Sequence, residues 1–235
     1  MAPTPRMAHR LTYARTMCGR FVLAGGVDEY AVFLHAARVV GDRVEPSWNV
    51  APTDPVLAAA EHRGERLLGT FRWGLVPHWS KARQPFHINA RMETVHEKPA
   101  FRDALRYRRC LIPADGFYEW TVEDDGRQPH YIQRDGGHFA FAGLWSKWDD
   151  PESGEELRTC SIITGPAAPT IASIHDRMPL HLSEGLWDDW LDRDLTDPGH
   201  ARSVLESASD GPALTHRLVS RDVNSVRNNT PGLLD

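Results

Sequence analysis

Short runs of apolar residues, separated by Pro, Gly and Asp, recur along the chain from residue 20 onward. Runs of this length bounded by turn-forming residues are typical of β-strands. Strands are therefore predicted in seven segments: 20–24, 56–62, 66–76, 108–122, 129–134, 138–148 and 157–165.

Two segments instead carry apolar residues at helical spacing, namely 28–40 and 183–194. In the second, Ser183 is a candidate N-cap. Its apolar residues would share one face of the helix: Leu186, Trp187, Trp190 and Leu191. Strands outnumber helices and do not alternate with them. This pattern predicts a single α+β domain around a curved, mostly antiparallel, barrel-like β-sheet with flanking helices.

The first sixteen residues show neither periodicity nor an apolar stretch of the kind found in a secretory signal. We expect residues 1–16 to be a disordered leader or an upstream-start artefact, and residues 17–235 to form the domain. No run approaches the roughly 20 apolar residues that span a bilayer. The protein is expected in the cytoplasm, with no membrane association.

Charge is distributed unevenly along the chain, although the net charge is only -5. Between Arg63 and Arg109 there are eleven Lys and Arg against four Asp and Glu, and between Glu119 and Arg158 there are four against ten. The first segment predicts a basic face for phosphates. The alternative is that most of these arginines are solvated surface charges.

The three cysteines are Cys18, Cys110 and Cys160, and none lies in a CxxC or His-rich ligand pattern. An odd number without such spacing argues against a disulfide framework and a zinc site, so no metal and no cofactor are predicted. Cys110 and Cys160 lie in apolar, β-branched runs and are predicted to be buried structural thiols. Cys18 differs because it follows Met17 at the entrance to the first predicted strand.

Several polar residues stand in apolar surroundings. Asn89 and Arg91 are two positions apart, so they would face the same side of an extended segment. Glu119 follows two aromatic residues, where an apolar setting favours the protonated carboxyl and suits it to proton transfer. His175 follows a short helical turn. Considered one by one, a structural hydrogen bond for Asn89, a salt bridge for Glu119 and a capping role for His175 remain open.

Seven motifs in fixed order extend from Met17 to about Asn229: "MCGRF", "WNVAP", "RWGLVP", "INARMETV", "ADGFYEW", "IHDRMP" and "VSRDVNSVRNN". Together they resemble the SOS response-associated peptidase family of abasic-site-sensing proteins. The resemblance implies a single α+β domain that binds single-stranded DNA and links itself covalently to an abasic site through an N-terminal cysteine. It also implies Cys18 as the nucleophile, with Asn89, Glu119 and His175 around it. The DNA contacts that it implies are Arg20, Trp73, Arg91, Trp120, Thr164 and Arg177.

The chemistry of a terminal cysteine is consistent with that role. An abasic deoxyribose opens to an aldehyde, and the α-amine of Cys18 would condense with it to an imine to which the thiolate adds, closing a thiazolidine ring. While a peptide bond joins Met17 to Cys18, that amine is an amide and the ring cannot form. We therefore expect either translation from Met17 followed by removal of the Met, or self-cleavage by Cys18 with Glu119 as proton carrier.

The expected partner is single-stranded DNA that contains abasic sites, bound by a monomer. When bound to DNA, the cytoplasmic protein is expected at the nucleoid. Arg20, Arg91 and Arg177 would grip phosphates, whereas Trp73 and Trp120 would stack on bases. For both tryptophans, plain core packing is the alternative.

Two other functions remain open at this stage. A processed terminal cysteine near Asn, Glu and His also suits an N-terminal-nucleophile cysteine peptidase or amidohydrolase. A non-covalent single-stranded DNA-binding module would make Cys18 dispensable. The activity that we expect is DNA–protein crosslinking, with autoproteolytic, peptidase-like and possible lyase-type chemistry.

Overall fold

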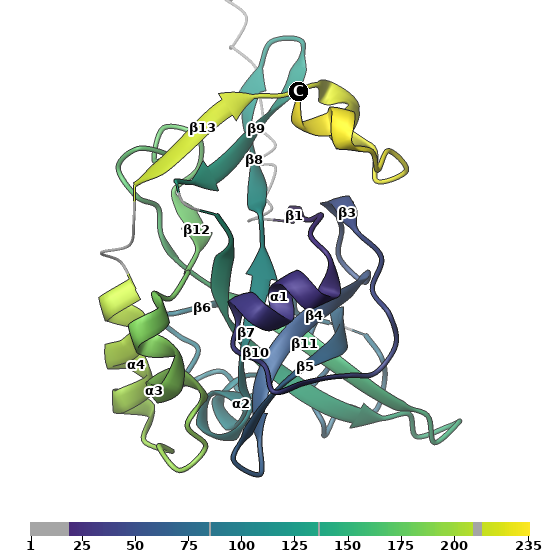
Figure 1. The fold of residues 1–235 in the computed structure, drawn as a ribbon, viewed down its shortest axis with the longest axis vertical. Coiled ribbons are helices and arrows are strands. Elements are labelled where there is room, and N and C mark those ends of the chain that lie inside the picture. Colours follow the sequence, from purple (N-terminus) through teal and green to yellow (C-terminus); the bar gives the residue numbers. More distant parts are fainter. Residues whose placement is uncertain (1–18, 85, 136, 209–212) are drawn as a thin grey trace, which may run out of the picture.

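A computed structural model describes residues 19–84, 86–135, 137–208 and 213–235. Cys18 and the preceding segment therefore lie outside the described residues. The elements of Figure 1 are strands and helices with these bounds: β1 (Phe21–Leu23), α1 (Val27–Phe33), β2 (Arg38–Val40), β3 (Ser47–Val50), β4 (Pro55–His62), β5 (Glu65–Trp73), β6 (Asn89–Arg91), α2 (Arg102–Tyr107), β7 (Arg109–Ala114), β8 (Gly116–Glu123), β9 (Gly126–Arg134), β10 (Phe139–Asp149), β11 (Glu156–Pro166), β12 (Arg177–Pro179), η1 (Glu184–Leu186), α3 (Trp187–Leu191), α4 (Pro198–Ser207), β13 (Leu214–Leu218), η3 (Arg221–Asn224) and η4 (Pro231–Leu234).

Five strands close into a barrel. β10 pairs with β11 and β7, and β4 pairs with β7 and β5, all of them antiparallel. β5 then pairs in parallel with β11, where Thr159 and Cys160 lie opposite Arg72 and Trp73, and this pairing completes the ring. The expectation of an α+β domain built on a mostly antiparallel, barrel-like sheet is confirmed.

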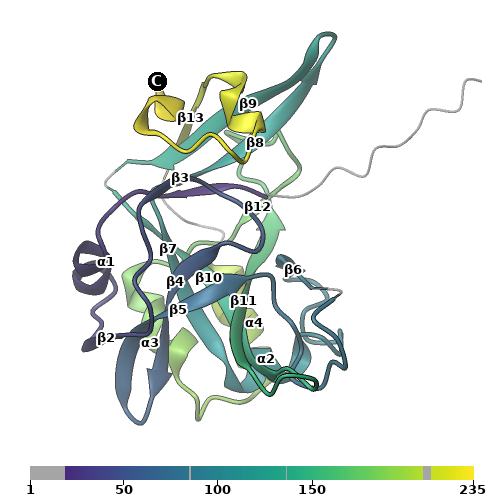
Figure 2. The same ribbon diagram turned by 90° about the vertical axis from the view of Figure 1, so that its right-hand side faces the viewer.

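A second sheet, in the order β13-β9-β8-β1-β3, lies above the barrel in Figure 2. Two short strands, β6 and β12, are attached to β11, one in parallel and the other antiparallel. β11 therefore belongs to the barrel and also carries two strands that hold predicted site residues.

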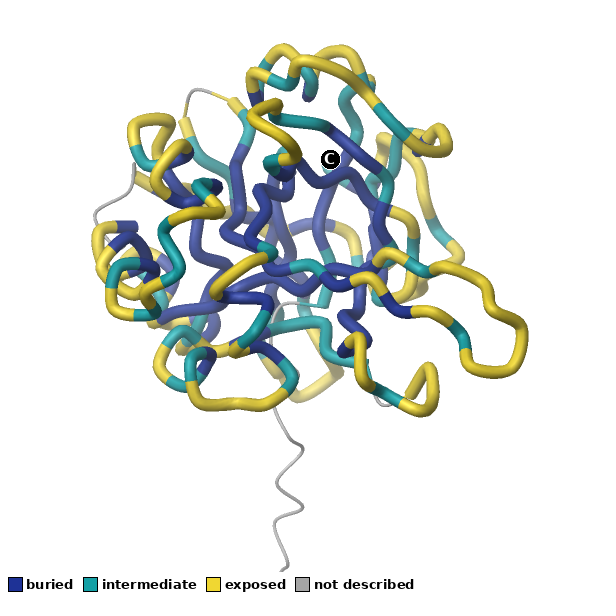
Figure 3. Tube along the Cα trace, turned by 90° about the horizontal axis from the view of Figure 1, so that it is seen from below, coloured by how far each residue is buried: buried dark blue, intermediate teal, exposed yellow. Residues whose placement is uncertain are grey.

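The barrel encloses the main hydrophobic core, which appears as the buried centre of Figure 3. Phe139, Phe141 and Phe117 pack in contact with one another there. Trp187 and Trp190 of α3 also reach this core, as their helical spacing predicts. No helix of the described residues is long and apolar enough to cross a membrane.

Four local predictions need correction. Residues 108–122 form two strands, β7 and β8, which belong to different sheets and meet at Asp115. The predicted helix 28–40 ends at Phe33, and its last three residues form β2 beside β5. Strand 66–76 ends at Trp73, because Gly74 adopts a φ of 125° that favours glycine. Ser183 occupies an N-cap position, but its side chain makes no capping hydrogen bond.

The predictions for two of the cysteines are confirmed. Cys110 and Cys160 are free thiols and fully buried. Burial raises the pKa of both thiols well above the ordinary value, which makes them poor nucleophiles.

Candidate functional site

The segment that enters β1 lies beside Glu119. β1 and β8 are antiparallel, with Phe21 opposite Phe117, and the Tyr118 amide donates to the Arg20 carbonyl at 3.0 Å. Continuing this register by two positions along each strand brings Gly19 next to Glu119. Glu119 is only 1% exposed and faces His130 across the β8–β9 ladder. The buried carboxyl-bearing residue Glu119 is therefore the neighbour, across the strand pair, of Gly19, the first described residue after Cys18.

An open pocket of about 490 Å³ is lined by residues from five of the seven sequence motifs. Gly19 and Arg20, which follow Cys18 in the chain, line this pocket. Ile88, which precedes Asn89, and Trp120, which follows Glu119, line it as well. The complete lining is Gly19, Arg20, Pro52, Ile88, Trp120, Arg127 and Asn224. The pocket thus borders the direct neighbours of Cys18, Asn89 and Glu119 in the chain.

β6 and β12 meet at the end of β11. Asn89 lies opposite Ile162 and Arg91 opposite Thr164 in the parallel ladder. Ala90 is buried, whereas Arg91 is exposed, so the segment alternates as the extended prediction requires. The Thr164 carbonyl accepts hydrogen bonds from the Met92 amide at 2.9 Å and from Arg177 Nη2 at 2.7 Å. Thr164 itself is buried, and its hydroxyl lies 3.5 Å from the Ala90 carbonyl.

His175 is buried in the turn that leads into β12. Its Nδ1 accepts the Arg177 amide proton at 3.0 Å and lies 3.2 Å from Asp176 Oδ1. The Arg177 carbonyl oxygen also lies 3.2 Å from Nδ1. These contacts within the turn fix the plane of the imidazole ring.

Arg177 forms a bidentate ion pair with Glu93. Nη1 donates to Oε1 at 2.9 Å and Nη2 donates to Oε2 at 2.8 Å. The hydrogen bonds from Arg177 hold the pKa of Glu93 below its usual value, and the Arg91 charge acts in the same direction. Arg177 is thus engaged by a carboxylate.

Arg20 is tied to the C-terminal segment. Its Nη1 donates to Asn49 Oδ1 and to the Val223 carbonyl, both at 2.9 Å. Asn49 is buried, and its amide donates to the Ser225 carbonyl at 3.0 Å and to the Asn228 carbonyl at 2.8 Å. Burial lowers the pKa of Arg20, but an arginine remains charged at neutral pH. Asn49 therefore holds Arg20 and the segment after β13 in one network.

Trp120 is partly buried at the rim of the pocket. Its indole N–H donates to Asn224 Oδ1 at 2.7 Å, and the Arg127 guanidinium carbon lies 4.9 Å from the ring centroid. The Asn224 amide in turn donates to the Arg127 carbonyl at 3.1 Å. These contacts hold the indole plane in one orientation.

The expectation that Trp73 stacks on a base is wrong. Trp73 is fully buried, its ring packs edge-on against Phe21 at 5.1 Å, and its N–H donates to the Ile88 carbonyl. The alternative, core packing, holds for this residue. Trp79 is 56% exposed, in the connection between β5 and β6 that ends at Asn89.

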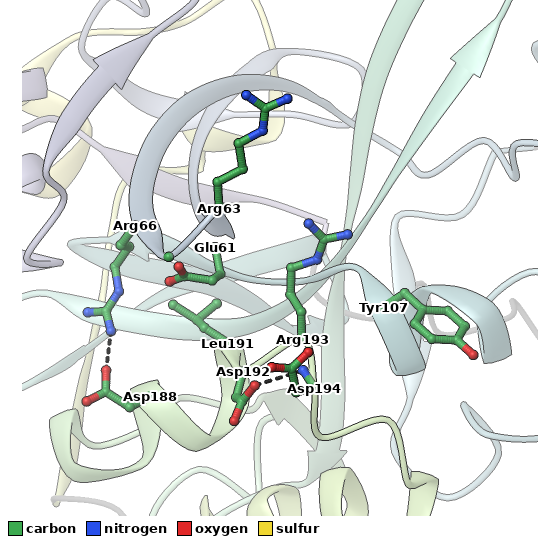
Figure 4. Close-up of a pocket in the computed structure, with 10 residues that line it drawn as sticks. Glu61, Arg63, Arg66, Tyr107, Asp188, Leu191, Asp192, Arg193 and Asp194 are labelled. Atoms are coloured by element: carbon green, nitrogen blue, oxygen red, sulfur yellow. Dashed lines mark hydrogen bonds and ion pairs between the residues drawn. The ribbon is translucent and has the colours of Figure 1, made fainter.

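The basic segment does not form one face. Arg63 and Arg66 lie at the β4–β5 hairpin, where they line a different pocket together with acidic residues of α3 and the segment that follows it (Figure 4). Arg66 pairs there with Asp188 at 2.5 Å. Arg109 is buried, and its guanidinium donates to backbone carbonyls. Arg66 and Arg109 therefore serve the fold, whereas Arg91 belongs to the site.

Sequence reasoning missed four residues that organise the site: Asn49, Glu93, Arg127 and Asn224. Three of them stand inside motifs already noted, namely "WNVAP", "INARMETV" and "VSRDVNSVRNN". The motifs therefore carried a signal, but the partner of each residue is distant along the chain and no local pattern identifies it.

The barrel, the strands β6 and β12 attached to β11, and the polar residues beside them are together typical of one class of protein. Residues 17–226 match the family described as SOS response associated peptidase (SRAP), and the chain belongs to that family. The sequence resemblance is confirmed.

Curated relatives of this chain include proteins from bacteria and vertebrates. "Abasic site processing protein YoqW" of Bacillus subtilis is 39% identical over 224 residues, which cover 93% of this chain and 99% of that protein. "Abasic site processing protein HMCES" of Gallus gallus is 33% identical, over 82% of this chain and 66% of that protein.

Solved structures share the fold. A protein of Bacteroides thetaiotaomicron superposes with a TM-score of 0.78 at 23% identity, over 92% of this chain and 98% of its own. A protein of Bordetella bronchiseptica gives a TM-score of 0.72 at 26% identity, over 86% of this chain and 100% of its own.

Proposed function

We propose that this protein processes abasic sites: it binds single-stranded DNA and captures the open-chain aldehyde of an abasic site as a thiazolidine on Cys18. Its membership of the family and the names of its relatives support abasic-site processing. The observation that carries the proposal is the pocket that Gly19 and Arg20 line together with Ile88 and Trp120. In this pocket the residues next to Cys18, Asn89 and Glu119 meet.

The covalent step balances without a cofactor. The Cys18 α-amine adds to the aldehyde carbon, and loss of one water gives an imine. The thiolate then adds to that carbon while the nitrogen takes up a proton, so the ring contains one new C–N and one new C–S bond. Arg20, two residues from Cys18, is a nearby cation that favours the thiolate.

Glu119 is the proton carrier in this proposal. Its side chain is almost fully buried next to the β1 entry, and such a setting suits a carboxyl that takes and returns protons. It would protonate the ring oxygen of the sugar so that the aldehyde forms, and then assist the loss of water. Asn89 would position the amine or a sugar hydroxyl, and His175 would assist proton transfer at C1′, including during reversal.

DNA binding in this proposal depends on the backbone and on the stacking of bases. Arg20, Arg91 and Arg177 contact phosphates, and Thr164 helps to place Arg91 and Arg177 through β11. Trp120 offers an oriented aromatic ring at the pocket rim. We assign to the exposed Trp79 the stacking role that the sequence interpretation gave to Trp73.

Thiazolidine formation requires a free α-amine on Cys18. We propose that residues 1–16 are not translated or are removed together with Met17, and that residues 17–235 make up the domain. Intact-mass measurement of protein expressed from the full reading frame tests this proposal. A full-length species that crosslinks abasic DNA with Met17 still attached contradicts it.

The decisive experiment is a denaturing gel. Wild-type protein and Cys18→Ser are incubated with a single-stranded oligonucleotide that contains one abasic site, and with the same sequence intact. We expect a denaturation-resistant shifted band for the wild type on abasic DNA alone. Equal shifted bands for Cys18→Ser, or none for either protein, would sink the proposal.

The same samples separate the alternatives. A non-covalent DNA-binding module would bind in a native gel and give no denaturation-resistant band. An N-terminal-nucleophile peptidase would release product from a peptide or amide substrate in a Cys18-dependent manner, without any need for DNA. Autoproteolysis predicts that Cys18→Ser retains the leader.

A further inference from the structure

Glu93 lies between two of the arginines that the proposed function assigns to DNA phosphates. Its carboxylate receives both ends of the Arg177 guanidinium, at 2.9 and 2.8 Å, and the Arg91 charge also acts on it. The Arg177 side chain is 14% exposed and that of Glu93 is 46% exposed. The pair therefore stands at the surface, where solvent and a strand of DNA have access to it.

The guanidinium N–H groups of Arg177 are largely occupied, so few of them can bind a second anion. Nη2 also donates to the Thr164 carbonyl at 2.7 Å. Nε is buried and finds no acceptor among the described residues. A carboxylate and a phosphate present two oxygens to a guanidinium in the same bidentate manner. A phosphate that takes this edge of Arg177 must therefore displace Glu93.

We propose that Glu93 occupies the phosphate position of Arg177 when DNA is absent, and so limits the affinity for undamaged strands. This inference rests on the proposed function, in which Arg177 contacts the backbone of single-stranded DNA. Arg177 holds the pKa of Glu93 low, so the carboxylate is ionised at neutral pH and competes as a full negative charge.

Weak binding of intact DNA suits a protein that captures its target covalently. An undamaged strand is held only by reversible contacts. Because Glu93 competes with a phosphate for Arg177, such a strand dissociates sooner. An abasic strand is retained by the new C–N and C–S bonds, whatever the strength of the initial contacts. Glu93 therefore determines specificity through binding and has no part in the chemical step.

The test compares Glu93→Gln with Glu97→Gln. Glu97 lies four residues away and loses the same charge on substitution, but its contact is with His96 at 3.5 Å and its side chain is 67% exposed. Dissociation constants for an undamaged single-stranded oligonucleotide are measured by fluorescence anisotropy over a series of KCl concentrations.

For Glu93→Gln we expect about fivefold tighter binding, because one charge-assisted contact to phosphate is released. The slope of log Kd against log salt should also steepen by about 0.7, the value for one additional phosphate on a single strand. Glu97→Gln should leave the slope at the wild-type value. In the background of Arg177→Ala, Glu93→Gln should give no gain beyond that of Glu97→Gln.

Crosslinking to an abasic oligonucleotide provides the second measurement. Glu93→Gln should crosslink faster than wild type at low protein concentration and at the wild-type rate at saturation. Weaker DNA binding, or the same change in Glu97→Gln, would show instead that Glu93 merely positions Arg177 or adds general charge. Wild-type protein that neither binds nor crosslinks overturns the proposed function and this inference together, an outcome distinct from failure of the variant alone.

Discussion

Arg20 and Asn49 share a hydrogen bond of 2.9 Å, from the guanidinium Nη1 to the side-chain oxygen. The same asparagine donates to the carbonyls of Ser225 and Asn228. A cation at the pocket is therefore positioned by a residue of β3, and that residue is fixed by the end of the chain. In the proposed function, this arrangement makes Asn49 a positioning residue for DNA binding.

Replacing Asn49 with Ala should weaken DNA binding several-fold and leave the crosslinking rate at saturation unchanged. The variant also loses the hydrogen bonds from the Asn49 amide to the carbonyls of Val223, Ser225 and Asn228, so the free energy of unfolding should fall by about 2 kcal/mol. Asn229→Ala is the matched control, because Asn229 Oδ1 accepts the Trp48 amide at 2.7 Å and so attaches the same C-terminal segment to β3. Equal loss of DNA affinity in both variants would contradict the role of Asn49.

Glu119→Gln should bind abasic DNA with wild-type affinity and crosslink about 100-fold more slowly. The substitution preserves shape in a nearly closed environment but removes the titratable proton. Anisotropy measures the affinity, and quenched time courses on denaturing gels measure the rate. A normal rate would make Glu119 a structural residue only.

Trp73→Phe should leave DNA affinity unchanged and destabilise the fold. The Ile88 carbonyl loses its donor, and the smaller ring leaves a void beside Phe21, together about 2 kcal/mol. Trp79→Ala should do the opposite, weakening single-stranded DNA binding without changing the unfolding midpoint. Reduced DNA affinity in Trp73→Phe at normal stability would indicate instead that Trp73 contacts DNA.

The His138–Asp115 pair should make the stability of the fold depend on pH. The imidazole contacts a carboxylate on each side, Asp115 at 2.6 Å and Glu29 at 3.0 Å. The hydrogen bond to Asp115 raises the pKa of His138, against burial that lowers it. For Asp115, burial alone would raise the pKa, but hydrogen bonds, that from His138 foremost, outweigh it and the pKa is lowered.

Because the pKa of His138 is higher in the folded than in the unfolded state, its contribution to stability is complete at a pH below the unfolded-state pKa. This contribution is lost as the pH rises through the folded-state pKa. The pKa of Asp115 is lower in the folded state, so its contribution to stability is lost only in acid. Denaturant unfolding of wild type and His138→Gln should therefore differ by about 1 kcal/mol near pH 6, and the difference should shrink towards pH 9. A difference that grows with pH would contradict the protonated pair.

The sequence predicted those parts of the fold that local patterns determine. Apolar runs identified most strands, because a buried strand needs a short continuous run of apolar residues. Asp115-Gly116 is a local turn signal, but the apolar residues on both sides of it favoured one strand over two. In the folded chain, Asp115 also accepts hydrogen bonds from Ala24 and Tyr30, which are remote in sequence. Likewise, β2 was included in a helix because its strand geometry arises only from pairing with β5.

The candidate site shows the same division. Motifs named Asn89, Glu119, His175 and the arginines, but two tryptophans in similar motifs have opposite environments. Phe71 and Trp73 alternate with the polar Thr70 and Arg72, a period of two that indicates an inward-facing Trp73. That signal was available. The partners of Arg20 and Arg177 were not, because both depend on contacts made by the folded chain.

The contact between Arg20 and Val223 joins residues 203 positions apart. Contacts of such separation form late, because a long loop must close before they contribute any stability. The barrel strands are closer in sequence and can assemble first, so a chain still emerging from the ribosome has its core before it has its pocket. Release of the C-terminal segment would likewise disable the pocket while the barrel stays folded. The pocket would in this way be completed only after the barrel has formed.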